Sequence, residues 1–108
     1  MAPYSLNGYS VPDLLKLLRQ ERGERIRLEV GSPPSLTVKG KDFEIEGPAI
    51  EAESVEGLLR TVADTRQMRT FRKFATVDII HTFGGARFLI RAVNAFGTCN
   101  VEFHAIKT

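Results

Sequence analysis

Residues 86–106, ARFLIRAVNAFGTCNVEFHAI, decide the fold that we predict, because they form two alternating segments around a short turn. Apolar side chains recur at every second position on both sides of Phe96 and Gly97, as expected for a β-hairpin that buries one face. We therefore predict two long strands joined at these two residues. Their apolar face comprises Phe88, Ile90, Ala92, Cys99, Val101, Phe103 and Ala105.

The opposite face of this hairpin mixes charged, polar and apolar side chains, and it is where we expect function. A two-residue turn at 96–97 places positions whose numbers sum to 193 opposite each other. Leu89 then faces His104, and Arg91 faces Glu102, so we predict that Arg91 and Glu102 form an ion pair across the strands. The face carries Arg87, Leu89, Arg91, Asn100, Glu102 and His104.

Length and composition indicate one globular domain, 1–108, with 1–9 as an extended lead-in. The 108 residues are 43% apolar and 26% charged, with a net charge of only +2, so nucleic-acid binding is not predicted. A single cysteine, Cys99, favours a reducing compartment. No apolar run approaches the roughly 20 residues needed to span a bilayer, and the N-terminus lacks a signal pattern. We therefore expect a cytoplasmic protein without membrane insertion.

Hydrophobic periodicity along the chain predicts an α+β fold of order αβββααβββ, an antiparallel sheet partly covered by helices. Helical spacing predicts one helix that begins at Ser10 and ends near Gly23, another over 52–62, and a third that Asp64 or Thr65 caps. Before the final hairpin, period-two alternation predicts strands from Arg25 to Val30, around Leu36 and Val38, around Phe43 and Ile45, and around Val77 and Ile79.

The third helix has a strongly basic side. We predict that Met68, Phe71 and Phe74 face the core. The intervening cations form a positive ridge, which is either a solvated helix face or a contact for an acidic partner. The ridge comprises Arg66, Arg69, Arg72 and Lys73.

Catalytic and metal-binding motifs are not found in the 108 residues. There is no glycine-rich phosphate loop, because Gly84 and Gly85 precede a predicted strand and not a helix. His81, Cys99 and His104 match no usual spacing of metal ligands, and Cys99 and His104 would lie on opposite faces of one strand. We predict no catalytic residue, no metal and no cofactor.

Five strings, in order and without large gaps, resemble the PAS-like N-terminal domain of the PilT/GspE family of type IV pilus and type II secretion ATPases. The resemblance covers 13–106, and it implies a PAS-like domain that precedes a RecA-like ATPase domain in a hexameric motor and packs against a neighbouring subunit. The strings are DLLKLL at 13–18, LEVGSPPSLTVKGK at 28–41, EGP at 46–48, VEGLLR at 55–60 and ARFLIRAVNAF at 86–96.

In that family the hairpin lends arginines to the phosphates of the nucleotide. The resemblance keeps the first of them as Arg87, whereas the other three fall on Leu89, Phe96 and His104. Two of these replacements are apolar and cannot donate to a phosphate. The resemblance therefore implies that at most a residual nucleotide contact survives, through Arg87.

Our leading hypothesis is a noncatalytic, PAS-like protein-interaction domain of a pilus, secretion or motility system. Its partner would be a motor ATPase, a regulator or a second copy in a homo-oligomer. One alternative is the N-terminal part of a working ATPase, and another is a PAS-like sensor with a small-ligand pocket under the sheet. His104 also allows a pH-sensitive contact. The candidate partner-binding face comprises Arg87, Leu89, Arg91, Phe96, Glu102 and His104.

Overall fold

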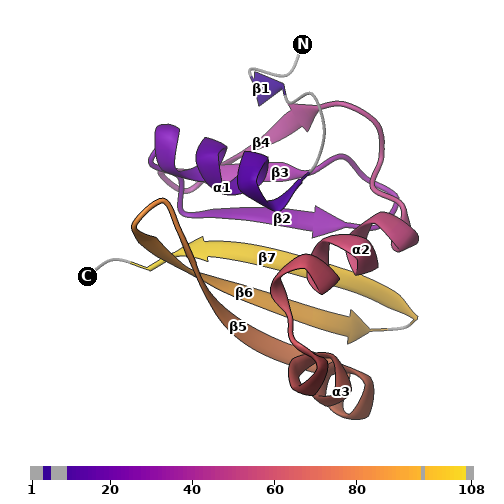
Figure 1. Ribbon diagram of the computed structural model, residues 1–108. Coiled ribbons are helices and arrows are strands. Elements are labelled where there is room, and N and C mark those ends of the chain that lie inside the picture. The colour runs from indigo at the N-terminus through magenta and orange to yellow at the C-terminus, as the bar shows by residue number, and fades with distance from the viewer. Residues whose placement is uncertain (1–3, 6–9, 96, 107–108) are drawn as a thin grey trace.

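The computed structural model describes residues 4–5, 10–95 and 97–106. Apart from the two-residue strand β1, the elements follow the predicted order αβββααβββ, so the α+β prediction is confirmed (Figure 1). β1 lies in the lead-in, where the sequence shows no periodicity. The elements are β1 Tyr4–Ser5, α1 Val11–Gln20, β2 Arg25–Glu29, β3 Ser35–Val38, β4 Lys41–Glu46, α2 Ala52–Val62, α3 Thr65–Phe74, β5 Thr76–Phe83, β6 Ala86–Ala95 and β7 Thr98–Ala105.

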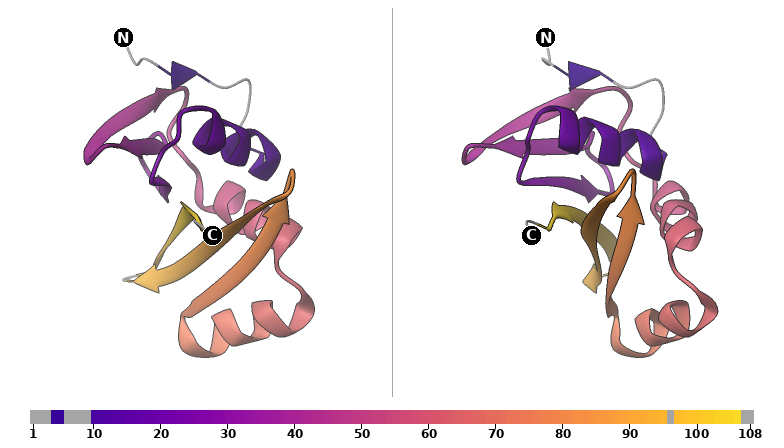
Figure 2. Two further views of the ribbon diagram at one scale, coloured as in Figure 1. Left: turned by 90° about the vertical axis from the view of Figure 1, so that its left-hand side faces the viewer. Right: turned by 60° about the vertical axis from the view of Figure 1, so that its left-hand side comes forward.

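The strands form one sheet in the order β1-β4-β3-β2-β7-β6-β5. β1 pairs with β4 in parallel, and every other neighbouring pair is antiparallel. Both views of Figure 2 place α3 at the end of the molecule remote from β1 and β4. No helix in 4–5, 10–95 and 97–106 has the length and hydropathy to cross a bilayer.

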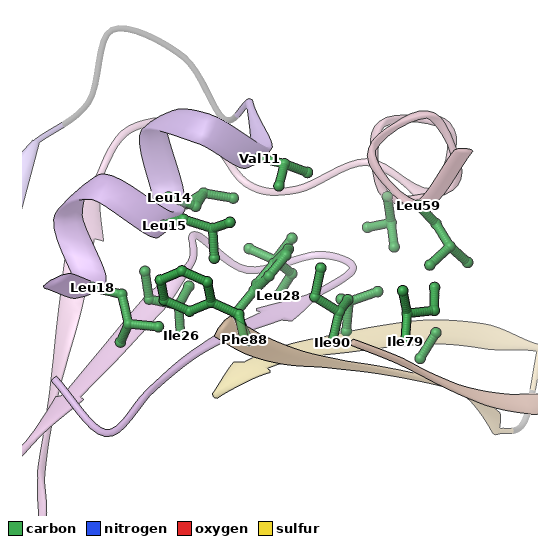
Figure 3. Close-up of a cluster of buried hydrophobic side chains, with 14 of the residues drawn as sticks. Val11, Leu14, Leu15, Leu18, Ile26, Leu28, Leu59, Ile79, Phe88 and Ile90 are labelled. Carbon is green, nitrogen blue, oxygen red and sulfur yellow. The ribbon is translucent and has the colours of Figure 1, made fainter. Parts of the chain in front are cut away.

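The core lies between α1, α2 and one face of the sheet, where side chains of both helices point onto the strands (Figure 3). Phe88 and Phe103 from the hairpin are completely or almost completely buried. Ile90, Ala92 and Val101 are buried beside them, which confirms the predicted apolar face of the hairpin. Its two ends, at Cys99 and Ala105, are only partly buried.

Helix α1 begins and ends where its sequence signals predict. Ser10 caps it, because its Oγ accepts a hydrogen bond from the Asp13 backbone N–H at 3.3 Å. The helix ends at Gln20, and Gly23 closes the cap by donating its N–H to the Leu18 carbonyl at 2.9 Å. The apolar stripe is buried against the sheet and comprises Val11, Leu14, Leu15, Leu17 and Leu18.

Helix α3 corrects one prediction about the core. Asp64 caps it in a reciprocal capping box with Gln67, and Met68 is buried as expected. Phe74, however, is 63% exposed. It lies six residues after Met68, about 240° around the helix axis, and therefore points away from the core. The predicted positive ridge is exposed throughout: Arg66, Arg69, Arg72 and Lys73.

The residue after α3 provides a test of its backbone conformation. Ala75 is left-handed, with φ 61°, which costs an L-residue about 1–2 kcal/mol. Ala75→Gly should therefore raise the free energy of unfolding by about 0.5–1 kcal/mol, measured by urea denaturation. Ala63→Gly, at the extended C-cap of α2, is the matched control and should lower it by a similar amount. If both substitutions changed the free energy of unfolding by the same amount and with the same sign, the left-handed conformation of Ala75 would be contradicted.

Candidate functional site

The candidate site is the outer face of the sheet, which we define as the side opposite α1 and α2. Its register in the hairpin is as predicted, because Leu89 pairs with His104 and Arg91 pairs with Glu102. Among the rows of side chains that cross this face from β5 through β6 and β7 to β2, two contain the pairs predicted from the sequence. One row is Ile80, Leu89, His104 and Arg25, and the other is Asp78, Arg91, Glu102 and Arg27.

Arg91 does not form the predicted ion pair with Glu102. Its Nε lies 2.9 Å from Asp78 Oδ1, and its Nη2 lies 3.2 Å from Asp78 Oδ2. Asp78 stands directly opposite Arg91 on β5 and offers both carboxylate oxygens to the guanidinium fork. The hydrogen bonds and charge of Asp78 raise the pKa of Arg91 above its usual value. The prediction was wrong because the position of β5 beside β6 supplies a better acceptor.

Glu102 instead joins β7 to β2 and to its own strand neighbour. Arg27 Nε lies 3.3 Å from Glu102 Oε2, and His104 Nε2 lies 2.8 Å from Glu102 Oε1. The side chains of Glu102 and His104 are 29% and 30% exposed. Burial alone would raise the pKa of Glu102, but the hydrogen bond with His104 and the charges of Arg27, His104 and Arg25 lower it below its ordinary value.

The lowered pKa of Glu102 predicts an acid-dependent loss of stability. A depressed carboxyl pKa stabilises the fold above the unfolded value, about pH 4.5, and this stabilisation is lost as pH falls through the folded value. In Glu102→Gln the free energy of unfolding should therefore fall less steeply at acid pH than in the wild type. Near neutral pH its dependence on pH should be the same as in the wild type. Glu53→Gln, at an exposed helix start, is the control. Identical acid limbs in wild type and Glu102→Gln would contradict the charge cluster.

Three aliphatic side chains lie on the outer face among these charges. Leu89 is partly buried, Ile80 is 51% exposed and Val93 is 37% exposed. Leu89 and Ile80 are direct neighbours on adjacent strands. The structure thus brings the proposed partner-binding residues Leu89, Arg91, Glu102 and His104 together, whereas Phe96 lies outside the described residues.

Two arginines of the outer face have groups without a partner. Arg87 is exposed beside Thr82 and has no ion pair or side-chain hydrogen bond within the described residues. Arg25 lies beside His104, and its buried Nε has no hydrogen-bond partner in this part of the chain. Four residues of this face were not predicted as part of the site: Arg25, Arg27, Asp78 and Ile80. The place of Arg25 and Arg27 beside the hairpin depends on strand order. The two-residue turn at Gly84 and Gly85 would have placed Asp78 opposite Arg91 and Ile80 opposite Leu89.

A hollow beside α2 and α3 lies at the edge of the core and not under the middle of the sheet. Its volume is about 410 Å³, within the range of small-molecule sites. Burial, and then the charge of Glu56, raise the pKa of the Cys99 thiol on its wall, so this thiol is a poor nucleophile. The hollow is lined by Ala52, Glu56, Met68, Phe71, Arg72, Ala75, Asn94, Gly97 and Cys99.

Comparisons with known proteins identify the architecture. No protein-family model and no curated protein matches the chain. Among solved structures, the Legionella pneumophila ATPase DotB superposes with a TM-score of 0.79 at 14% identity, over 99% of this chain and 32% of DotB. The pilus retraction motor PilT with bound ADP gives 0.79 at 16% identity, over 94% of this chain and 30% of PilT. The fold is shared with DotB and PilT.

A third match supports the same assignment. The Yersinia pseudotuberculosis ATPase DotB superposes with a TM-score of 0.65 at 18% identity, over 89% of this chain and 29% of that protein. The chain therefore spans about a third of the length of the DotB and PilT structures that it matches. The resemblance expected from the sequence is confirmed at the level of fold.

Proposed function

We propose that this chain is a noncatalytic, PAS-like interaction domain of a pilus or secretion system, and that its outer sheet face binds a DotB- or PilT-type motor ATPase. The observation that carries this proposal is the aliphatic pair of Ile80 and Leu89, with Val93 farther along β6 beyond Arg91, on a face that α1 and α2 leave uncovered. Aliphatic side chains surrounded by charges are typical of protein interfaces.

The charged side chains favour a protein partner for this face. Asp78 with Arg91, and Glu102 with Arg27 and His104, already satisfy one another. A partner therefore need not supply a compensating charge for each of them. Such pairs form a polar rim around the aliphatic side chains, and rim charges set specificity and association rate more than affinity.

The same contacts argue against a nucleotide role for the outer face. Leu89 stands where the second family arginine would lie, and its neighbour His104 is bonded to Glu102. Arg91 is held by Asp78. Only Arg87 offers a guanidinium without a partner in the described part of the hairpin, and a single exposed cation is a weak phosphate site.

Binding of the purified chain to a full-length DotB- or PilT-type ATPase tests this proposal. We expect measurable association by biolayer interferometry, weakened at least about tenfold by Leu89→Glu because it places a carboxylate directly beside Ile80. Leu58→Glu is the matched control, since Leu58 is also partly buried but lies on α2. Absence of binding by the wild-type chain, or equal loss in both variants, would refute the proposal.

A second candidate function is that of a nucleotide-contacting part of a motor ATPase. It is favoured by the fold match to PilT with bound ADP and by the free guanidinium of Arg87. In that case ADP should raise the melting temperature of the chain, and Arg87→Ala should remove the shift. If ADP has no effect at millimolar concentration, the interaction domain remains the better account.

A small-ligand sensor is the weakest of the three candidates. It would use the hollow beside α2 and α3, where Glu56, Arg72 and Asn94 are the polar side chains. In the core itself the large side chains of Phe88 and Phe103 are buried. Native mass spectrometry of the chain purified from cells should show the mass of the polypeptide alone, whereas a retained small molecule would favour the sensor.

A further inference from the structure

β5 forms an edge of the sheet. In the described part of the chain no strand follows it in the order β1-β4-β3-β2-β7-β6-β5. Figure 1 shows it as the outermost strand of the hairpin layer, with α3 lying only at its beginning. At the other side of the sheet, β1 covers β4 at Ile45 and Glu46. A strand of eight residues with an uncovered edge presents backbone groups that a further strand can pair with.

The register of the β5–β6 hairpin tells which backbone groups point outward. Phe83 pairs with Ala86 across the two-residue turn, and the pair that flanks such a turn is hydrogen-bonded. The odd-numbered residues of β5 therefore bond to β6. The N–H and C=O groups that point away from β6 belong to Thr76, Asp78, Ile80 and Thr82, whose side chains are all exposed on the outer face.

This edge lacks the usual protection against pairing. The strand TVDIIHTF contains no proline and no lysine, the residues that commonly block an edge. Its one carboxylate, Asp78, is held by Arg91 toward the interior of the sheet. Ile80 lies in the middle of the edge with 51% of its surface exposed. The edge is thus both unpaired and apolar at its centre.

We propose that a second copy of this chain occupies the edge, with the two β5 strands antiparallel about a twofold axis at Ile80. Ile80 then faces the partner's Ile80, and Asp78 faces the partner's Thr82. Such an isologous contact is self-complementary and closes at two copies. The outer faces of both copies join into one continuous surface, because residues of the same parity pair with each other.

Side-chain chemistry selects this register among those that the backbone allows. In this register Ile80 and Leu89 lie in one row with the partner's Ile80 and the partner's Leu89, so an aliphatic strip crosses the interface. A shift of one step places a polar residue opposite the partner's Ile80, either Asp78 or Thr82 according to its direction, and so separates the two isoleucines. A further step in the direction of Asp78 places the two carboxylates opposite each other, where like charges repel.

Charge complementarity supports the same register. Arg87 has no ion pair in the described residues and lies beside Thr82. The partner's Asp78 lies on the other side of Thr82 from Arg87, and the long Arg87 side chain can reach across the small threonine to it. The row then reads Arg87, Thr82, the partner's Asp78 and the partner's Arg91, in which the carboxylate lies between two cations.

The inference goes beyond the proposed function, because it concerns the edge of the sheet and names the partner as a second copy. It does not depend on binding to a motor ATPase. A dimer without ATPase binding would refute the proposed function alone, and ATPase binding by a chain that stays monomeric would refute this inference alone.

Sedimentation equilibrium of the full chain tests the edge contact. We expect a monomer–dimer equilibrium whose dissociation constant Ile80→Lys raises at least about tenfold, because lysine blocks an edge strand. Val93→Lys is the matched control, since Val93 is an exposed aliphatic residue of the same face on the inner strand β6. Circular dichroism melts establish that both variants fold. A chain that is monomeric at about 1 mM, or a dimer that both variants weaken equally, would overturn the inference.

Cross-linking tests the register separately. In a Cys99→Ala background, Ile80→Cys should be joined to its own copy by a short bismaleimide, because residues directly opposite across antiparallel strands have Cβ atoms about 4.5–5.5 Å apart. Asp78→Cys should cross-link much less, because two Asp78 positions lie several residues apart along the paired strands. Efficient cross-linking of Asp78→Cys without that of Ile80→Cys would overturn the register.

Discussion

Phe88→Ala should lower the free energy of unfolding by about 3–5 kcal/mol, because it removes the phenyl ring that fills the space under α1. The side chain has no exposed surface, and it lies between the strands and the leucines of α1. Urea denaturation measures the change, and the slope with denaturant should stay constant if the fold is retained. A loss of this size is a large part of the stability of an ordinary domain.

The adjacent residue provides the matched control for this substitution. Leu89→Ala changes the outer face of the same strand, where the side chain is only partly buried. It should cost about 1 kcal/mol or less. Equal losses at the two positions would contradict the division of the hairpin into a core face and an outer face.

Leu89→Arg combined with His104→Arg should create an anion site on the outer face. The two positions pair directly, and Arg25 is the next residue in the same row. The nearby carboxylate of Glu102 already pairs with Arg27 and cannot balance three guanidinium groups, which repel one another unless a further anion lies between them. Inorganic phosphate should therefore stabilise the double variant, by about 2.7 kcal/mol at one hundred times its dissociation constant, and leave the wild type unchanged.

A second pair of substitutions isolates the role of the neighbouring arginine. Val93→Arg with Asn100→Arg introduces the same charges at directly paired positions, but there the next residue on β2 is Glu29. This carboxylate supplies the missing negative charge, so phosphate should have little effect. Melting curves in phosphate and in chloride of equal ionic strength measure the difference. If phosphate does not raise the melting temperature of the double variant at 89 and 104, the alignment of these two positions with the family arginines is contradicted.

The hairpin could be predicted almost completely from the sequence, because its information is local. Alternation defined the core face, and the short turn defined the pairing of Leu89 with His104. The positions of α1 and α2 followed in the same way from periodicity, and that of α1 also from its Ser10 cap. These elements depend on contacts between residues close in the chain.

The charge network was not predicted correctly, and only one of its two parts depends on contacts between strands distant in the chain. Arg91 was expected to bind Glu102, but β5 brings Asp78 nearer, while β2 brings Arg27 to Glu102. The contact of Arg27 follows from the order β2-β7-β6-β5, which no local pattern contains. The pairing of Asp78 with Arg91, in contrast, follows from the two-residue turn at Gly84 and Gly85, a local signal that the prediction did not use. The prediction that Phe74 is buried was wrong for a simpler reason. Phe74 is the last residue of α3, and only one side of this helix packs against the core.

We propose above all that the outer face of the sheet binds a DotB- or PilT-type ATPase. Methyl-labelled chain titrated with the unlabelled ATPase, and observed by NMR, tests it most directly. We predict that methyl signals of Ile80, Leu89 and Val93 shift or broaden first, while those of Leu58 on α2 change least. Changes centred on α2, or no change at saturating ATPase, would contradict the account.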